Sequence, residues 1–381
     1  MERRTTTIAV VGAGITGLSV AWHLSQLSVG HITLLDRSGV GSGATAIQPG
    51  GVRQQWSTDI ACRMARESYL FYRDAASRLE ARIDPGLTTC GYLFVAEAAE
   101  QFDDLRRLID IQHSAGVPSQ ILAPDDVASL VPGLDASAIV GAAFCAQDGY
   151  FDRPQALVAA FSDSNRRAGV DFVFANVVAL ESDGSGWQLS LSDGSSCFAE
   201  QVVVAAGKES ALLLQGYGEE LPITGEPRFL FYSNPIKERL LEPLVVSQER
   251  GFAAKHLADG SVLASDLRAS GDPSVEAKSW RRTIRDAIKA LVPILEYVSF
   301  PVIVRGDYDV TPDKQPILGK VSGCETLWVA AGLNGRGLMM APTIGRVLAD
   351  AIVGRDADEA LLRFSPNRFS RGLLEPERNV V

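Results

Sequence analysis

The stretch TIAVVGAGITGLSVAWHLSQ, residues 7–26, decides the fold that we expect for this chain. Its first residues are apolar and β-branched, which is typical of a buried parallel strand. The glycine turn GAGITG (12–17) follows, and apolar residues then recur at helical spacing. A second apolar run, HITLLD (31–36), comes next. The sequence therefore predicts a βαβ unit whose first strand enters its helix through a glycine turn.

This glycine turn has the GxGxxG spacing of a dinucleotide site. Gly12, Gly14 and Gly17 permit a tight turn, close approach of a pyrophosphate and close packing of helix on strand. Asp36 ends the second strand, where a carboxylate can accept hydrogen bonds from ribose hydroxyls and repel a 2′-phosphate. The pattern indicates dinucleotide binding, but Asp36 does not distinguish FAD from NAD. The alternative is a Rossmann-like fold with a degenerate site.

Two later stretches extend the expected nucleotide site. VVVAAG (202–207) ends in small residues that suit a backbone packed on a nucleotide, although they equally suit an ordinary core strand. The polar, glycine-rich loop 41–56 would cost conformational entropy unless a large ligand ordered it. We therefore predict an α/β (α+β) protein with a discontinuous Rossmann-like domain and an inserted second domain. The expected segments are 1–86, 145–216 and 302–381 for the first, and 87–144 and 217–301 for the second.

Composition excludes several classes of protein. The 381-residue chain has a net charge of −10 and no long basic run, which argues against a nucleic-acid partner. Its apolar runs are far shorter than the roughly 18 residues of a membrane span. The five cysteines are scattered without CxxC spacing and the four histidines are dispersed, so we expect reduced thiols and no metal site. Because residues 1–7 also lack the features of a signal peptide, we expect a cytoplasmic protein.

Several blocks together resemble the flavin-dependent amine and amino-acid oxidoreductase family, which includes D-amino-acid oxidase, glycine oxidase and sarcosine oxidase. Three of them, GGVRQQWS, RGDYDVTPDKQPILG and GLMMAP, are most similar to the β-subunits of heteromeric sarcosine oxidase and L-proline dehydrogenase. The blocks occur in family order from about residue 7 to about residue 370. They are VVGAGITG (10–17), LLDRSGVGSGAT (34–45), GGVRQQWS (50–57), CGYLFVA (90–96), DGYFDRPQAL (148–157), VVVAAG (202–207), VTPDKQPILG (310–319) and VAAGLNGRGLMMAPTIGRVLAD (329–350).

The resemblance implies FAD as the cofactor, a Rossmann-like FAD-binding domain and a substrate domain built on a mostly antiparallel sheet. It also implies a position along FAD for each matching residue. The pyrophosphate would lie against Gly12, Gly14, Ile15, Thr16 and Gly17, with Ser42, Gly43, Ala44 and Thr45 nearby; the adenosine ribose against Asp36, with Arg37 beside it; and adenine against Val177. Ala206 and Gly207 would close over the nucleotide. The isoalloxazine would lie against Gly51, Val52, Arg53, Gly306, Gly332, Leu333, Asn334, Gly335, Arg336, Gly337, Leu338 and Met339.

Departures from the family pattern fall at the expected flavin ring. The family turn reads G-x-x-G-H-G-F, and here Arg336 replaces the histidine. A permanent cation there would stabilise reduced flavin or attract a carboxylate; the alternative is an outward-pointing arginine. Met339 stands where some amine oxidases place a substrate-binding lysine, and Tyr308 where glycine-oxidase-like members place a carboxylate-binding arginine. Arg53 is then either an active-site cation or part of a structural salt bridge. We take Arg53, Tyr308 and Arg336 as the candidate catalytic residues.

Two further expectations concern the flavin and its electron acceptor. Gly306 and Gln48 lie near the usual positions of covalent attachment and cannot form the bond, so we expect non-covalent FAD. Lys255 and His256 are expected to be exposed residues of a hairpin. The lysine that some amine oxidases use to activate oxygen has no clear counterpart, since Leu263 falls near its place. This favours a dehydrogenase over an oxidase.

The resemblance implies oxidation of the C–N bond of a small amino acid, imino acid or N-methylated amine by hydride transfer to flavin N5. Oxygen or another acceptor would then take the electrons. The similarity to β-subunits keeps open a second reading, a flavoprotein subunit of a heteromeric amine dehydrogenase with little activity alone. An NAD-dependent dehydrogenase is a third reading, against which the turn at 332–339 and the loop 41–56 argue.

Overall fold

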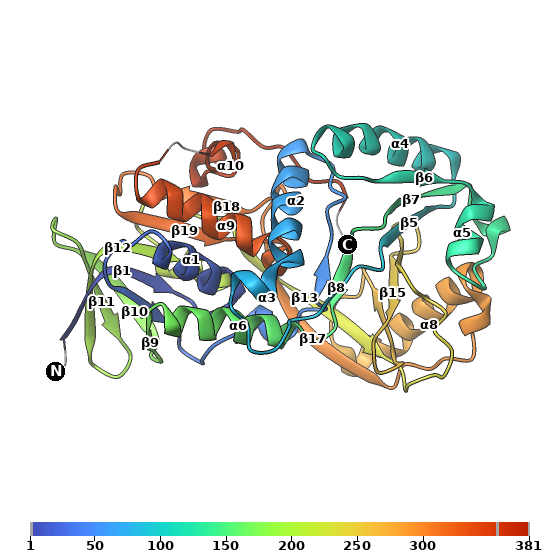
Figure 1. Cartoon of the computed structure of the whole chain (residues 1–381), viewed down its shortest axis with the longest axis horizontal. Coiled ribbons are helices and arrows are strands. Elements are labelled where there is room, and N and C mark those ends of the chain that lie inside the picture. Colours follow the sequence, from blue (N-terminus) through green and yellow to red (C-terminus); the bar gives the residue numbers. More distant parts are fainter. Residues whose placement is uncertain (1–2, 356–357, 380–381) are drawn as a thin grey trace.

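The computed structural model describes residues 3–355 and 358–379 and shows an elongated molecule with a large β-sheet in each half (Figure 1). In this part of the chain the strands form two sheets of eight strands and one of three. The predicted mixed α/β class with a discontinuous Rossmann-like sheet is confirmed, because strands that are distant in sequence lie side by side in the first sheet.

The first sheet has β1 near its centre, as the glycine stretch predicts. β1 pairs in parallel with β2 on one side and with β12 on the other, while β10 and β11 form an antiparallel hairpin at one edge. β19 pairs in parallel with the end of β12. The strands are β1 (Arg3–Val11), β2 (Ile32–Leu35), β9 (Asp171–Val173), β10 (Val177–Ser182), β11 (Trp187–Leu191), β12 (Ser196–Val204), β18 (Ile317–Lys320) and β19 (Leu327–Ala331).

Three helices cover one face of this sheet, with α1 between the other two (Figure 1). They are α1 (Ile15–Ser25), α6 (Pro154–Arg167) and α9 (Gly337–Ile352). Ile8 and Val10 point into this layer and pack with Leu18. A methyl group on Gly345 would lie 2.5 Å from Ser19 Oγ, so only glycine lets α9 approach α1 this closely. The first and last parts of the sequence are thereby joined in one layer.

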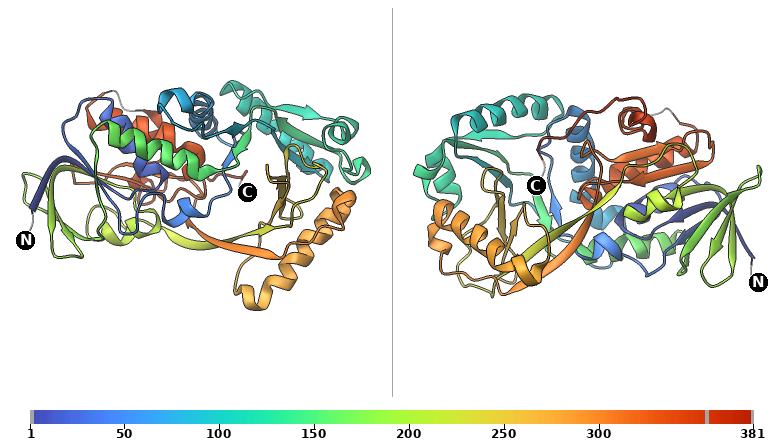
Figure 2. Two further views of the ribbon diagram at one scale, coloured as in Figure 1. Left: turned by 60° about the horizontal axis from the view of Figure 1, so that its bottom comes forward. Right: turned by 180° about the vertical axis from the view of Figure 1, so that it is seen from behind.

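The second sheet is mostly antiparallel, as the resemblance implies, with one parallel pair between β5 and β14. Helix α8 (Pro273–Leu291) and α5 (Pro124–Leu130) cover one face, where Trp280 stacks on Phe229; α4 (Ala99–Ser114) covers the other (Figure 2). The strands are β5 (Tyr92–Ala96), β6 (Gln120–Leu122), β7 (Gly141–Cys145), β13 (Thr224–Tyr232), β14 (Leu244–Ser247), β15 (Phe252–His256), β16 (Val262–Asp266) and β17 (Val302–Val310).

The long strands β13 and β17 run between the two halves (Figure 1). The predicted boundaries assign residues 302–310 to the nucleotide domain. In the structure these residues pair with β13 in the second sheet. The division of the chain into domains stays a prediction. A small sheet of β3 (Gly51–Val52), β4 (Leu87–Thr88) and β8 (Gly149–Phe151) lies between the large ones.

The other helices are short, apart from α2. Helix α2 ends at Arg73, because Asp74 leaves the helical conformation with φ of −107° and ψ of 16°. These helices are α2 (Asp59–Arg73), α3 (Ala75–Arg78), α7 (Ser210–Leu213) and α10 (Glu359–Arg363). Among the described residues, no helix combines the length and apolar character needed to cross a membrane.

Candidate functional site

Two glycine turns converge on one cavity of about 1110 Å³. Gly14 and Thr16 line it from the turn between β1 and α1, and Gly335 and Leu338 line it from the turn between β19 and α9. A methyl group on Gly337 would lie 3.7 Å from Thr16 Oγ1, so the two turns adjoin each other. Neither helix has a side-chain cap or an acidic residue in its first turn. Both helix dipoles therefore present partial positive charge to the cavity.

The end of the cavity near β1 is built largely from backbone. Gly12 adopts φ of +113°, and a methyl group there would overlap the carbonyl oxygen of Ala205 at the end of β12. A methyl group on Gly17 would overlap the carbonyl oxygen of Gly12. These two glycines hold the turn against the neighbouring strand. The cavity wall here consequently lies close to the main chain, as a bound diphosphate requires.

Asp36 organises the loop around this end. Its Oδ2 accepts a hydrogen bond from Ala13 N at 2.8 Å, and its Oδ1 accepts from Ser38 N at 2.8 Å and Gly39 N at 2.9 Å. Ser42 Oγ lies 3.2 Å from the same Oδ1. Because Oδ2 accepts a single hydrogen bond, Asp36 retains acceptor capacity toward the cavity that it lines.

The opposite end carries polar side chains with unused hydrogen-bonding atoms. Asp309, on β17, is buried with 9% of its surface exposed, and its Oδ2 has no partner. Burial raises the pKa of Asp309 to about 6, while hydrogen bonds from the backbone of Leu333 and Gly332 act in the opposite direction. Gln48 Oε1 accepts from Gly50 N at 2.7 Å, but its buried Nε2 has no partner. Both side chains line the cavity, so they offer an acceptor and a donor to a ligand there.

Tyr308 links this end of the cavity to the turn before α9. Its ring lies where a methyl group on Gly335 would be, and Gly335 has φ of +78°. Burial raises the pKa of the Tyr308 hydroxyl, and the nearby Arg228 and Arg53 partly oppose the rise. The hydroxyl is therefore protonated at neutral pH and can donate a hydrogen bond.

Arg53 and Arg336 lie together around Trp56. Their guanidinium carbons are 3.7 and 4.4 Å from the centroid of the Trp56 ring. Both arginines are buried, with 2% and 1% of their surface exposed, and the Nε of each has no partner. Burial lowers the pKa of Arg336 to about 10, and the charge of Arg53 adds to that effect. The outward orientation that was one reading of Arg336 is therefore wrong.

Neutral oxygens hold both guanidinium groups. Arg53 donates to the carbonyl oxygens of Gln55 and Asn379, each at 2.9 Å. Arg336 donates to Gln315 Oε1 at 2.8 Å and to the carbonyl oxygen of Lys314. Within residues 3–355 and 358–379, neither arginine has a carboxylate within the 4.0 Å of an ion pair, so the salt bridge considered for Arg53 does not form in this part of the chain.

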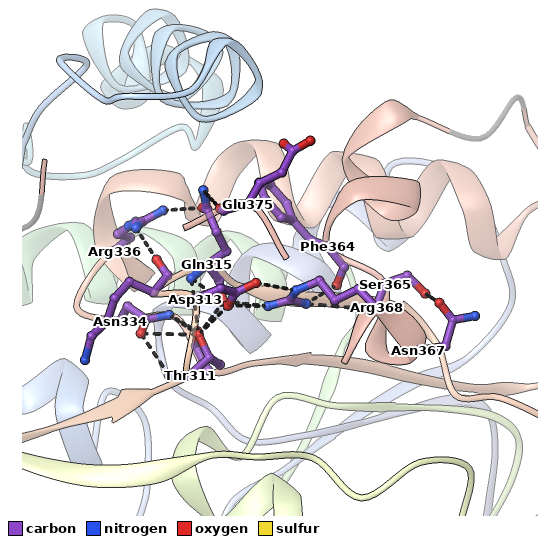
Figure 3. Close-up of polar contacts among 12 residues, drawn as sticks. Thr311, Asp313, Gln315, Asn334, Arg336, Phe364, Ser365, Asn367, Arg368 and Glu375 are labelled. Atoms are coloured by element: carbon purple, nitrogen blue, oxygen red, sulfur yellow. Dashed lines mark hydrogen bonds and ion pairs between the residues drawn. The ribbon is translucent and has the colours of Figure 1, made fainter. Parts of the chain in front are cut away.

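A polar network fixes the turn that carries Arg336 (Figure 3). Asn334 adopts φ of +53° and exchanges hydrogen bonds with Thr311, whose N donates to Asn334 Oδ1 at 3.0 Å. Asp313 forms a buried ion pair with Arg368 at 2.7 Å. Gln315, which accepts from Arg336, also bonds Thr311 through its N. The residues before β18 therefore clamp the turn from one side.

A second network fixes the loop that carries Arg53. The carboxylate of Asp148 accepts from Gln54 N at 2.9 Å, from Gln54 Nε2 at 3.0 Å and from Gln55 Nε2 at 3.0 Å. All three residues are completely buried. Burial raises the pKa of Asp148 to about 6, and these hydrogen bonds oppose that rise. Asp148 thus holds residues 54–55 and, with them, the neighbouring Arg53.

Comparison with known proteins agrees with this geometry. A family model described as "FAD dependent oxidoreductase" matches residues 7–351. The chain belongs to the FAD-dependent oxidoreductase family. It is 27% identical over 371 residues to glycine oxidase of Geobacillus kaustophilus (strain HTA426), covering 95% of this chain and 96% of that protein.

Two further relatives bear on fold and length. The crystal structure of L-proline dehydrogenase from P. horikoshii superposes with a TM-score of 0.90 at 24% identity, covering 98% of this chain and 100% of that chain, which supports the fold. The 4-methylaminobutanoate oxidase (formaldehyde-forming) of Paenarthrobacter nicotinovorans is 27% identical over 387 residues, covering 96% of this chain but 46% of that protein. The chain thus spans about half the length of that relative.

The cavity fits FAD, the cofactor of this family. Glycines at one end bring the main chain to the position that a diphosphate needs, and the unpartnered Gln48 Nε2 and Asp309 Oδ2 at the other end suit a ligand with both donors and acceptors. Gly306, also on the wall, has no side chain through which a covalent bond could form. Gln48 and Asp309 were not among the predicted cofactor residues. The polar residues of RGDYDV, unusual in a strand, are the sequence signal that could have found Asp309.

Most predicted cofactor residues line the FAD cavity. They are Gly12, Gly14, Ile15, Thr16, Asp36, Arg37, Ser42, Gly43, Ala44, Thr45, Val177, Ala206, Gly207, Gly306, Leu333, Gly335, Gly337 and Leu338, together with the candidate Tyr308. The lining does not include Gly17, Gly51, Val52, Arg53, Gly332, Asn334, Arg336 or Met339. Of these, Gly51 packs against Tyr92 and Met339. A methyl group on Gly51 would overlap the Tyr92 hydroxyl and would lie 3.2 Å from Met339 Cε.

The prediction that Lys255 and His256 are exposed is wrong. Both are buried, with 1% and 0% of their surface exposed, because β15 lies inside the second sheet. Lys255 Nζ donates to the carbonyl oxygen of Pro49 at 2.7 Å and lies 3.7 Å from the centroid of the Tyr150 ring. Burial lowers the pKa of Lys255 to about 7. The sequence thus did not reveal that Lys255 lies beside the loop that leads to Gly51. The alternation of residues along a hairpin does not show which strands lie inside a sheet.

Proposed function

We propose that the protein oxidises the C–N bond of a small amino acid, imino acid or N-methylated amine. The observation that carries the proposal is the pair of buried arginines around Trp56, each with an Nε that is unpartnered among the described residues. Arg336 lies between Gly335 and Gly337, both of which line the FAD cavity. Glycine oxidase and 4-methylaminobutanoate oxidase, two relatives of this chain, are named for substrates that combine an amine with a carboxylate. A carboxylate is the ligand that a desolvated guanidinium binds best.

FAD, when bound, accepts a hydride from the carbon that carries the nitrogen. The chain's own residues supply position and charge. Arg53 and Arg336 would hold the substrate carboxylate, and the Tyr308 hydroxyl would donate a hydrogen bond beside the cavity. The helix α9 N-terminus would stabilise negative charge on the reduced cofactor. Orientation over the ring is the main contribution that this arrangement can make to the rate.

An anaerobic bleaching screen tests the proposal. The holoenzyme is mixed with sarcosine, proline, glycine, D-amino acids or opines, and loss of flavin absorbance is followed. We expect at least one of these to reduce the flavin. Arg53→Ala should raise the apparent Kd for that substrate about 100-fold, with Arg53→Lys between it and the wild type. Unchanged affinity in Arg53→Ala would remove Arg53 from the substrate site.

We also propose that FAD is held without a covalent bond, because glycine and glutamine occupy the two attachment positions that the family resemblance indicates. Acid precipitation should release the chromophore into the supernatant. Yellow colour that stays in the pellet would contradict this.

The preference for a dehydrogenase over an oxidase and the cytoplasmic location both stay predictions. The leaning toward a dehydrogenase rested on the lack of a lysine in the substrate sheet, and the buried Lys255 weakens that argument. Comparing oxygen consumption with dye reduction after substrate addition separates oxidase from dehydrogenase. A cytoplasmic location is proposed from the scattered, unpaired cysteines alone.

A second candidate function is a flavoprotein subunit of a heteromeric amine dehydrogenase with little activity alone. The similarity of GGVRQQWS, RGDYDVTPDKQPILG and GLMMAP to β-subunits of heteromeric enzymes favours this reading. In 4-methylaminobutanoate oxidase, of which the chain spans 46%, the matched region is joined to further sequence. Co-purification with a partner, together with flavin that substrates bleach only in the complex, would favour this reading. Full bleaching of the isolated chain would exclude it.

A further inference from the structure

The segment Glu375–Asn379 passes from the residues before β18 to the loop that carries Arg53. Gln315 Nε2 donates to the carbonyl oxygen of Glu375 at 3.2 Å (Figure 3), and Glu377 N donates to the carbonyl oxygen of Asp313 at 3.0 Å. At the other end, Asn379 accepts from Arg53 Nη2 at 2.9 Å and donates through Nδ2 to the carbonyl oxygen of Gln55 at 2.8 Å. We call residues 375–379 the strap.

The second sheet also contacts the strap. Gln248 Nε2, from the turn between β14 and β15, donates to Asn379 Oδ1 at 2.9 Å. The strap thus touches both halves of the molecule, as the bonds of Asn379 to Gln55 and Gln248 show. Glu377 and Asn379 are buried, with 4% and 3% of their surface exposed. Such burial is unusual for a charged residue that, like Glu377, has no ion-pair partner among the described residues.

Glu377 has one satisfied and one unsatisfied oxygen. Its Oε1 accepts from Ser57 N at 2.8 Å and from Asn379 N at 2.9 Å, whereas its buried Oε2 has no partner in residues 3–355 and 358–379. The Nε atoms of Arg53 and Arg336 are buried and unpartnered in the same part of the chain. Three buried charged groups, two cationic and one anionic, thus each keep one unused atom.

The charges of this group act on each other. Burial lowers the pKa of Arg53 and of Arg336, and Glu377 raises both. Glu377 is linked to Arg53 through Asn379, whose N donates to Glu377 Oε1 and whose carbonyl oxygen accepts from Arg53 Nη2. Asp148 raises the pKa of Arg53 as well, and Asp313 that of Arg336. A substrate carboxylate at the two arginines would be repelled by the charge of Glu377.

We propose that Glu377 is a specificity-determining residue, a fixed buried carboxylate beside Arg53 and Arg336 that sets how strongly the site accepts the carboxylate of a substrate. This inference rests on the proposed function, in which the arginines bind that carboxylate. The charge of Glu377 lowers the affinity of the site for acidic ligands. Removing its charge then strengthens carboxylate binding and leaves neutral ligands unaffected.

Glu377→Gln tests this, because glutamine keeps an oxygen that can accept from Ser57 N and Asn379 N. The holoenzyme is titrated with propionate and with the neutral propionamide, and the perturbation of flavin absorbance gives each Kd. We expect the Kd for propionate to fall roughly tenfold and that for propionamide to stay constant. The matched control is Glu375→Gln in the same strap, since the Glu375 side chain is 56% exposed and pairs with Arg363. It should behave as wild type.

The outcomes separate the possible failures. If both Kd values rise together in Glu377→Gln, the residue only clamps the strap, and the proposal is overturned. If Glu377→Gln equals wild type while Arg53→Ala abolishes the response to propionate, Glu377 has no part in specificity although the arginine site stands. If Arg53→Ala leaves the propionate Kd unchanged, the carboxylate site of the proposed function fails, and the strap proposal fails with it. Steady-state kinetics of Glu377→Gln that show a lower KM and an unchanged kcat for an acidic substrate would support the proposal independently.

Discussion

The two ends of the FAD cavity are built from different materials. The end near β1 consists of main chain brought close by Gly12 and Gly17, and Asp36 there is engaged with backbone amides. The end near β17 carries buried polar side chains, among them Asp309, with atoms that have no partner among the described residues. The first end therefore presents mainly main chain to the cavity, whereas the second presents side-chain donors and acceptors.

This contrast separates residues that hold the cofactor from residues that act on the bound ligand. At the end near β1, the main chain of the glycine turn (the main-chain cradle) packs so closely that it has no room for a side chain. Substitutions of these glycines should therefore weaken both cofactor binding and folding. Buried charges cost free energy in the absence of a ligand, so their removal should stabilise the empty protein and impair function. The four changes below test that contrast, from the largest expected effect to the smallest.

Gly17→Ala should abolish the main-chain cradle. The new methyl group would overlap the carbonyl oxygen of Gly12, and backbone cannot move aside as a flexible side chain can. We expect at least a 100-fold loss of FAD affinity, which is about 2.7 kcal/mol, and a loss of about 3 kcal/mol in the free energy of unfolding. Flavin fluorescence titration and denaturant unfolding measure these. Gly225→Ala, whose methyl group would meet only Lys208 Cδ at 3.4 Å, is the control.

Lys255→Met should flatten the pH dependence of stability. Burial lowers the pKa of Lys255 from 10.5 to about 7, so between these values the unfolded chain binds a proton that the folded chain does not. Wild-type stability therefore rises with pH through this window. We expect the variant to lack about 2 kcal/mol of the rise between pH 7 and 9, and the exposed Lys289→Met to keep it. An identical slope in Lys255→Met and wild type would mean that this lysine stays charged in the fold.

Asp309→Asn should stabilise the cofactor-free protein and weaken FAD binding. Burial raises the pKa of Asp309 from 3.8 to about 6, so the folded state binds the extra proton between these values and stability falls as pH rises through them. At pH 7.5 the variant should gain about 1 to 2 kcal/mol without FAD and bind FAD several-fold more weakly. Asp307→Asn on the same strand, which breaks the partly exposed pairs with Lys208 and Arg305, is the control. Unchanged FAD affinity would show that the free oxygen does not meet the cofactor.

Gly335→Ala tests the smallest contact, that between the turn before α9 and Tyr308. Gly335 has φ of +78°, so the backbone conformation of alanine there costs about 1 kcal/mol. The methyl group would also overlap the Tyr308 ring. Gly354→Ala, at φ of +76° with open space around it, carries the same backbone cost. The difference between the two isolates the contact with the Tyr308 ring, which we expect to appear as a shifted flavin spectrum in Gly335→Ala alone. Matching spectra in the two variants would separate Tyr308 from the flavin.

The sequence predicted the backbone end of the site far better than the charged end. GxGxxG spacing, an apolar strand and Asp36 report local geometry, so the cradle and its βαβ unit could be predicted directly. The burial of Lys255 depends on the position of β15 inside a sheet that runs from β17 to β6. A local sequence pattern does not predict that position. The neighbours of Arg53 include Asn379, so its surroundings depend on a pairing across nearly the whole chain. Long-range burial is the physical information that local periodicity lacks.

The pairing of β1 with β12 has a consequence for how the chain acquires its fold during synthesis. Residues 3–11 meet residues 196–204, and α1 meets α9, so one edge of the first strand and one face of the first helix stay uncovered until distant segments have left the ribosome. Contacts of such separation slow folding, because a long loop must close first. A chain that ended before α9 would carry the glycine turn between β1 and α1 without the turn between β19 and α9 that adjoins it. The two walls of the cavity that these turns form are therefore brought together by contacts between the first and last parts of the sequence.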